Sequence, residues 1–272
     1  MTVIFKAKTR EGYSLKVLAE LLQNNIKTAC FEVDKKGIRL RMMDHHRTVL
    51  IDLELEADSF SVYKFNSKEK LYLGINLSHF HKMLRSIKKR DIIQMSIDDK
   101  NQTDLVIEVI PKENNRVTTS VVKIQTIQNI DIDIPEGYGK PVIVPSGEFQ
   151  KMCKSLSQIS KQTHITSRGL SIKFSCDAGG VMKRQTEFGE IDRDDDSDDS
   201  DDEKETDYDE EFNTEQLTKI TKLSGLSNML QIFPKCGNPL LFKTQVGTLG
   251  KISVYIKSKN MMDAESKTVE ED

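Results

Sequence analysis

The sequence has 272 residues, of which 37% are apolar and 31% charged, and its formal net charge at pH 7 is −3. This length suits one large domain or two ordinary ones. No run approaches the roughly 18 apolar residues that a membrane span needs, and the N-terminus lacks a signal-peptide pattern, so we expect an intracellular protein without a membrane partner. The four cysteines are scattered without a CxxC pair, which argues against zinc and against a disulfide framework, and no metal or cofactor is expected.

The first half of the chain predicts strands interrupted by two short helices. Alternating apolar and β-branched residues favour strands at 2–7, 28–33, 37–43, 47–55, 59–65, 92–98, 103–110 and 117–124. Apolar residues at helical spacing favour helices at 13–24 and 78–87. The segment QTIQNIDIDIPEGY at 125–138 alternates Ile with polar residues, a pattern typical of an extended connector between two halves of similar length.

The second half shows the same mixture and adds an acidic segment. Strands are predicted at 140–144, 162–166, 170–176, 181–187, 239–246 and 251–257, and helices at 147–158 and 214–223. Residues 190–204 form a low-complexity acidic loop that cannot pack. In this loop Ser197 and Ser200 are each followed by Asp and resemble sites for an acidophilic casein-type kinase.

The charges are sharply divided along the chain. Residues 190–211 carry 15 acidic and 2 basic side chains, and residues 263–272 carry 5 acidic and 1 basic, so the remaining body has a net charge of +14. An acidic appendage on a basic body indicates a polyanionic partner for the body, and a surface charged only for solubility is the alternative.

An internal repeat connects the two halves. The segments HFHKMLRSI at 79–87 and EFQKMCKSL at 148–156 align without a gap at an offset of 69 residues. Each predicts a helix with one apolar face, made by Phe80, Met83, Leu84 and Ile87 in the first and by Phe149, Met152, Cys153 and Leu156 in the second. A basic stripe lies elsewhere on three helices, comprising Lys82 and Arg85, Lys151 and Lys154, and Lys219 and Lys222, while the helix at 13–24 has only Lys16. The repeat indicates a duplicated architecture, with ordinary solvated lysines as the alternative.

An ordered set of segments gives the chain a family resemblance. They are LRMMDHHRTVLIDLEL at 40–55, LGINLSHFHKMLRSI at 73–87, IDIPEGY at 132–138, PSGEFQKMCKSLSQIS at 145–160, Phe212, GLS at 225–227, the Pro-Leu pair at 239–240, and GTLGKISVYIKSK at 247–259. Outside the acidic loop and the tail, the chain resembles the proliferating cell nuclear antigen family, the sliding clamps of eukaryotes and archaea.

The resemblance implies an α+β protein with the DNA clamp fold, in which two similar domains carry antiparallel sheets outside and short helices that line a ring hole. It implies a clamp domain at 1–124, a connecting segment at 125–139, a second clamp domain at 140–260 and an acidic tail at 261–272. A homotrimer would encircle duplex DNA without sequence preference and tether a DNA polymerase and other replication and repair enzymes after a clamp loader has opened it. The expected location is the nucleus, or a viral replication site if the source is a large DNA virus, and no enzymatic activity is expected.

The resemblance also implies three sets of site residues. The candidates for the DNA-facing lining are Lys16, Lys82, Arg85, Lys88, Lys151, Lys154, Lys161, Lys219 and Lys222. The subunit contact strands match RVTTSVVKI at 116–124 and VMKRQTE at 181–187, with Val117, Ser120, Val121, Val181 and Lys183 as contact residues and ordinary internal strands as the alternative. The pocket for partner peptides corresponds to Met43, Leu50, Ile132, Ile134, Pro239, Tyr255 and Ile256.

The chain departs from the family pattern near that pocket. Arg47 and Thr48 replace smaller or apolar groups, and Lys257-Ser258 stands where an Ala-Pro pair is usual. The preferred partner peptide is therefore not predicted. The modification lysine of the family has no counterpart in the loop THITSRGLS at 163–171.

Other functions gain little from the sequence. It contains no GxxxxGK[ST] loop and no GxGxxG after a strand, which argues against a nucleotide-binding enzyme. A magnesium-dependent nuclease is the best enzyme alternative. Two non-enzymatic alternatives are a subunit of a heterotrimeric checkpoint-type clamp and a monomeric processivity factor. A mass measurement on the pure chain separates these from a homotrimer.

Overall fold

The chain folds into two compact units, which we describe one at a time from a computed structural model. The structure describes residues 3–113, 115–128, 130–190 and 207–270. Unit 1 comprises residues 1–133, 225–227 and 244–254, and unit 2 comprises residues 134–224, 228–243 and 255–272. The predicted kinase sites Ser197 and Ser200, and the acidic loop beyond Glu190, lie outside the described residues.

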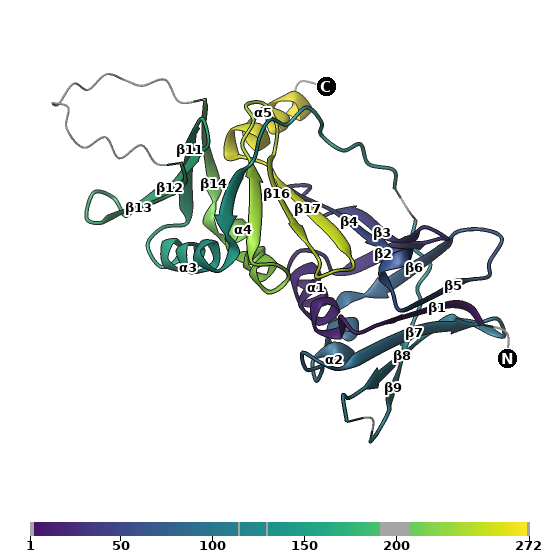
Figure 1. The fold of residues 1–272 in the computed structure, drawn as a ribbon. Helices are drawn as coiled ribbons and strands as arrows, with labels where there is room; N and C mark the ends of the chain where they lie inside the picture. Colours follow the sequence, from purple (N-terminus) through teal and green to yellow (C-terminus); the bar gives the residue numbers. More distant parts are fainter. Residues whose placement is uncertain (1–2, 114, 129, 191–206, 271–272) are drawn as a thin grey trace. The chain divides into compact units, whose positions relative to one another are not determined.

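Unit 1 contains two helices and two antiparallel sheets (Figure 1). Its helices are α1 (Gly12–Asn25) and α2 (Leu77–Leu84). Its strands are β1 (Val3–Thr9), β2 (Thr28–Val33), β3 (Gly37–Met43), β4 (Val49–Glu56), β5 (Val62–Phe65), β6 (Leu71–Asn76), β7 (Ile92–Asp98), β8 (Asn101–Ile110), β9 (Thr118–Lys123) and most of β17 (Gly250–Ile256), with a 3-10 turn at Ala57–Ser59. One sheet has the order β5-β1-β7-β8-β9, and the other runs β17-β4-β3-β2-β6.

Unit 2 repeats this arrangement with three helices. They are α3 (Ser146–Ser157), α4 (Thr214–Lys219), which continues into a 3-10 turn at Thr221–Gly225, and α5 (Lys259–Glu270). Its strands are β10 (Val142–Pro145), β11 (Gln162–Arg168), β12 (Ser171–Asp177), β13 (Lys183–Gly189), β14 (Tyr208–Asn213), β15 (Met229–Phe233) and β16 (Leu240–Gln245). One sheet has the order β13-β12-β11-β14, and β10, β15 and β16 are neighbours in the other. Within each unit the first two helices contact each other, α1 with α2 and α3 with α4. The α+β clamp fold is thus confirmed.

The helices bury the predicted apolar faces with one exception. Phe149, Met152, Cys153 and Leu156 of α3 are all buried, but Met83 of α2 is 37% exposed, so its assignment to the core face was wrong. Successive residues of a helix are about 100° apart, and α2 ends one turn early, so its core stripe is the narrow one of Leu77, Phe80 and Leu84. Met83 lies roughly 90° from the centre of that stripe.

Among the strands and α-helices in the described ranges, the sequence patterns did not predict β6, β14, β15 and α5. The last is the most informative, because it occupies the predicted acidic tail. The Ser258 hydroxyl accepts a hydrogen bond from the Met261 N–H at 3.3 Å and caps the start of α5. The Lys257 ammonium, two residues before α5, contacts both carboxylate oxygens of Glu265 in that helix, at 2.6 and 2.7 Å. The two residues that depart from the family's Ala-Pro pair therefore start and hold this helix.

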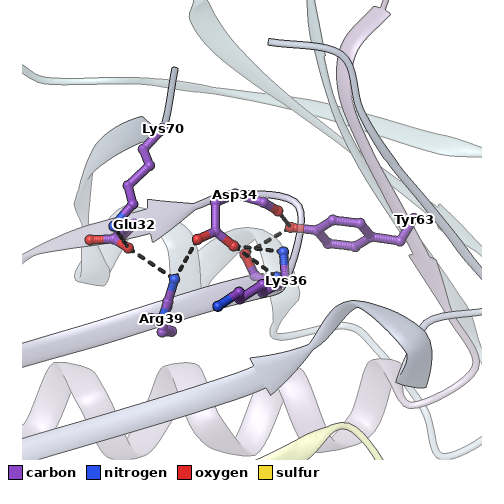
Figure 2. A network of polar contacts seen from close by, with 7 residues as sticks. Glu32, Asp34, Lys36, Arg39, Tyr63 and Lys70 are labelled. Atoms are coloured by element: carbon purple, nitrogen blue, oxygen red, sulfur yellow. Dashed lines mark hydrogen bonds and ion pairs between the residues drawn. The ribbon is translucent and has the colours of Figure 1, made fainter. Parts of the chain in front are cut away.

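A polar network fixes the tight turn between β2 and β3 (Figure 2). The Asp34 carboxylate accepts hydrogen bonds from the N–H groups of Lys36 at 2.7 Å and Gly37 at 3.2 Å. The Tyr63 hydroxyl on β5 points at the carbonyl oxygens of Asp34 and Gly37, at 2.6 and 2.8 Å. Side chain and backbone of Asp34 thus both hold the turn, and through Tyr63 they tie it to the neighbouring sheet.

Charged side chains extend the network along β3. Arg39 pairs with Asp34 and with Glu32, the latter at 3.2 Å, and Lys70 pairs with Glu32 at 2.8 Å. Burial by itself would raise the pKa of Asp34, but the hydrogen bonds from the turn and the Arg39 charge together lower it below its ordinary value. A carboxyl group whose pKa is lowered by folding stabilises the fold above its unfolded pKa of about 3.9, and that stability is lost as the pH falls through the folded value.

Replacing this carboxylate tests its contribution. Asp34→Ala is expected to lower the free energy of unfolding by about 1–2 kcal/mol at pH 7, because two turn N–H groups and Arg39 lose their acceptor. The difference from the wild type should shrink below about pH 4. Urea denaturation at pH 7 and pH 3.5 measures both values, with the exposed Asp58→Ala as the control. A difference that stays the same at pH 3.5 would contradict the assigned role.

Candidate nucleic-acid interface

The basic stripes lie on the helix faces directed away from the core. On α2 and just beyond it, Lys82 and Arg85 are about 200° and 140° around the helix from buried Phe80, and both are exposed. On α3, Lys151 and Lys154 have the same angular offsets from buried Phe149 and are also exposed. The cores of both units therefore orient their cations in the same way.

In unit 1 the candidate cations divide into free and engaged groups. Lys82, Arg85 and Lys88 are exposed, and none has an ion-pair partner among the described residues. Lys16 is half-buried, and its ammonium donates a hydrogen bond to the Ile87 carbonyl at 3.1 Å. Lys16 is thus already used to join α1 to the segment that follows α2.

In unit 2 acidic neighbours partly neutralise the stripe. Lys151 pairs with Glu148 at 2.7 Å and Lys219 pairs with Glu215 at 2.8 Å, each about one helical turn away. The hydrogen bond from Lys219 and its charge lower the pKa of Glu215. Two further candidates, Lys154 and Lys161, are exposed, and Lys222 is half-buried. Exposed pairs at this spacing contribute only about 0.2–0.5 kcal/mol, so a stronger anion can displace the carboxylates.

The predicted subunit contact residues lie in or beside strands at sheet edges. β9 ends one sheet of unit 1 and β13 ends one sheet of unit 2, and no strand in the described ranges pairs with their outer sides. The Ile124 N–H bonds to Thr103 on β8, so the alternation of an antiparallel pair directs the Val121 N–H to the open side. Val117, Val121 and Val181 are 54%, 50% and 90% exposed, which is unusual for valine. Ser120 lies on β9 and is half-buried, and Lys183 begins β13 and is exposed.

Three of the predicted pocket residues belong to unit 1. Met43 on β3 is directly opposite Leu50 on β4, and the Ile132 carbonyl accepts a hydrogen bond from Arg41 at 3.2 Å. Arg41 also pairs with Asp52 at 3.1 Å, opposite it on β4. Met43 and Ile132 are half-buried, whereas Leu50 is nearly covered. This arrangement attaches the connector to the surface of β3.

The other four pocket residues belong to unit 2. Ile134 and Pro239 are half-buried, whereas Tyr255 is 6% exposed and Ile256 is fully buried. Tyr138 at the end of the connector was not among the predicted residues. Its hydroxyl donates to the Pro239 carbonyl at 2.7 Å, and its ring lies 6.1 Å from that of Tyr255. The aromatic residue in the PEGY sequence was the available signal for this role.

Lys235 and Asn238, in the loop between β15 and β16, also hold the connector. Their side chains donate to the Glu136 carbonyl at 3.1 and 3.2 Å, and the Lys235 ammonium lies 5.9 Å from the Tyr138 ring. Ile256 is covered by the core, whereas Ile134 and Pro239 keep part of their side chains exposed.

The residues that depart from the family at the rim form a fixed loop. The Asp44 carboxylate accepts hydrogen bonds from the N–H groups of Thr48 and Val49, at 2.7 and 2.9 Å, and from the Thr48 hydroxyl at 3.0 Å. Arg47 is exposed with a φ of 56°, in the left-handed region that few residues other than glycine adopt.

In the described part of the chain no three His, Cys, Asp or Glu residues come together as a metal site, and no helix there is long and apolar enough to cross a membrane.

Comparisons with known proteins agree along nearly the whole chain. Residues 4–134 match the family described as "Proliferating cell nuclear antigen, N-terminal domain", and residues 133–266 match "Proliferating cell nuclear antigen, C-terminal domain". Among curated proteins, the chain is 27% identical over 260 residues to the "Probable DNA polymerase sliding clamp 1" of Paramecium bursaria Chlorella virus 1. That alignment covers 93% of this chain and 96% of the viral protein.

The acidic partners of the unit 2 lysines allow a direct test of the interface. Glu148→Gln combined with Glu215→Gln should strengthen binding to a 30-base-pair duplex several-fold and steepen its salt dependence, because two cations are released from ion pairs. Fluorescence anisotropy between 50 and 200 mM NaCl measures both effects. The control is Glu69→Gln with Glu113→Gln, which makes the same charge change on exposed loops of unit 1. Equal gains in the two double variants would show that only net charge matters.

Proposed function

The chain belongs to the proliferating cell nuclear antigen family and is a DNA sliding clamp that serves as a polymerase processivity factor, and we propose that three copies close the ring. The observation that carries the trimer is that β9 in unit 1 and β13 in unit 2 each end a sheet and carry exposed valines, Val117 and Val121 at β9 and Val181 just before β13. An open edge with apolar neighbours is a ready template for pairing with a second chain. Pairing of β9 in one copy with β13 in the next is heterologous, so it forms a ring when the rotation closes.

The DNA-facing surface in this proposal is the outer side of the helix pairs. Lys82, Arg85 and Lys154 have no acidic partner among the described residues, so they are available to phosphate groups. Contacts of long cationic side chains with phosphates carry no sequence information, and this lets a ring move along the duplex.

Partner proteins are proposed to bind along the connector. In an extended chain, alternate residues point the same way, so Ile132 and Ile134 present one apolar edge. Arg41, Lys235 and Asn238 hold the backbone on either side of these residues. A short peptide with aliphatic and aromatic anchors is the expected ligand, because such side chains supply most of the affinity at small apolar interfaces.

Other aspects of the biology follow from membership of the family. Sliding clamps act as processivity factors without enzymatic chemistry, and we extend that to this chain. A closed ring needs a clamp loader to admit DNA, and the place of action is the nucleus or a viral replication site. In a checkpoint-type heterotrimer, different chains would pair with β9 and β13. In a monomeric factor, no chain would pair with either strand.

Proline substitution at the open edge tests the assembly. Val121→Pro should convert trimers to monomers at micromolar concentration, because it removes a donor from the outer side of β9 without breaking the ladder to β8. Size-exclusion chromatography with light scattering gives the mass, and Val121→Thr, which keeps the N–H, is the control. A wild type that is monomeric across this range, or a proline variant that stays trimeric, would contradict the proposal.

Truncation of the connector edge tests partner binding. Ile132→Ala with Ile134→Ala should abolish stimulation of the DNA polymerase encoded by the same genome, while trimer mass and DNA binding are unchanged. Primer extension on a long single-stranded template measures processivity. The control is Asp131→Asn with Asp133→Asn, because these exposed neighbours point the other way along the extended chain. Full processivity in the isoleucine variant would place the partner site elsewhere.

A further inference from the structure

Three exposed cations in succession follow α2 and were only partly recognised in the sequence. Lys88, Lys89 and Arg90 are all exposed, and only Lys88 was among the predicted DNA-facing residues. With Lys82 and Arg85 they place five cations within nine residues that contain no acidic side chain. None of the five forms an ion pair with another described residue.

These cations stand on a turn whose conformation is fixed. The carboxylate of Asp91, a residue only 7% exposed, accepts a hydrogen bond from the Lys88 N–H at 2.9 Å, and the Asp91 N–H bonds to the Lys88 carbonyl at 3.1 Å. The turn also packs closely on the start of α1, where a Cβ atom on Gly12 would lie 2.8 Å from the Asp91 carbonyl oxygen. The buried carboxylate thus organises the backbone and leaves the charge of the three cations uncompensated at the surface.

Contacts with α1 position the turn further. Lys16 donates to the carbonyl of Ile87, the residue just before the turn. The ammonium groups of Lys16 and Lys89 each lie 5.8 Å from the centre of the Tyr13 ring. Two cations held against one ring form a preorganised positive site, since the attraction of the ring offsets part of their mutual repulsion.

The segment that follows α3 in unit 2 has no cations at the corresponding positions. At the 69-residue offset of the internal repeat, Lys88, Lys89 and Arg90 correspond to the uncharged residues Ser157, Gln158 and Ile159. Unit 2 also engages two of its stripe lysines in ion pairs with Glu148 and Glu215. The positive charge offered to a polyanion is therefore concentrated on unit 1.

We propose that the turn of Lys88, Lys89 and Arg90 is a dedicated binding element for the phosphates of duplex DNA, and that it makes unit 1 the main DNA-holding half of each clamp subunit. This rests on the proposed function. The competing role for the cations is stabilisation of the α2 C-terminus through its dipole, which would affect folding rather than DNA binding.

The test compares three charge-matched triple variants of the full chain. The turn variant is Lys88→Ser, Lys89→Gln and Arg90→Gln, and the unit 2 variant is Lys151→Gln, Lys154→Gln and Lys161→Gln. The control is Lys35→Ser, Lys36→Gln and Lys68→Gln, on exposed loops between strands of unit 1. Anisotropy with a labelled 30-base-pair duplex between 50 and 200 mM NaCl gives affinity and salt slope, and thermal melting monitors folding.

The turn variant should bind about tenfold more weakly at 50 mM NaCl, with a salt slope reduced by about 0.9 for each phosphate group that the turn no longer neutralises. Its affinity should fall further than that of the unit 2 variant, and the control should change least. An unchanged slope with a lowered melting temperature would establish the dipole role and overturn the inference, as would an equal decrease in the turn and unit 2 variants. If the wild type forms trimers and supports processive synthesis in these cases, the clamp function stands and only the inference fails.

Discussion

Burial of one narrow face on each short helix is the constraint on which the rest of the structure depends. Phe80, Phe149 and Leu217 are each fixed in a core, and the helical rotation of about 100° per residue then determines where every other side chain points. Lysines or arginines two and five positions further along are exposed after Phe80 and Phe149, and they are half-buried after Leu217, where Lys222 lies in a 3-10 turn. A surface that must attract a polyanion without reading its sequence can therefore be built three times from one local pattern.

Some sheet edges are covered by other segments of the same unit, and others are open. The edge of β6 is covered by the start of the connector, whose Gln125 N–H bonds to the Gly74 carbonyl at 2.7 Å. The edge of β14 is covered by α5, since Lys259 and Asn260 bond to Glu211 and Glu210, neighbours that point to opposite faces of the strand. The covering segment follows β9 in unit 1, and the one in unit 2 follows β17. The edges of β9 and β13, like those of β5 and β10, have no strand on their outer side in the described chain, and β9 and β13 are the two that carry exposed valines.

Much of this architecture could be predicted from the sequence, because periodicity and repetition report on burial. All four predicted helices and most strands are present where the apolar spacing placed them. β6 was missed because Gly74 interrupts the strand pattern. Glycine is required at this position because a Cβ atom on residue 74 would lie 2.1 Å from the carbonyl oxygen of Gln125 in the connector. β14 was missed because YDEEFN continues the charge of the acidic segment. Local patterns could not show that Lys16 is engaged by a carbonyl 71 residues away, or that Ile256 is covered.

The helical state of the tail has a consequence for how far it extends. Twelve residues in α5 span about 18 Å at 1.5 Å per residue, whereas the same residues in an extended chain would span about 40 Å. The Ser258 cap and the ion pair between Lys257 and Glu265 therefore shorten this segment by about half and keep it on unit 2. A fluorophore or fused protein joined after this helix reports on the second unit of its own subunit, whereas one joined to an unstructured tail would sample a much larger volume.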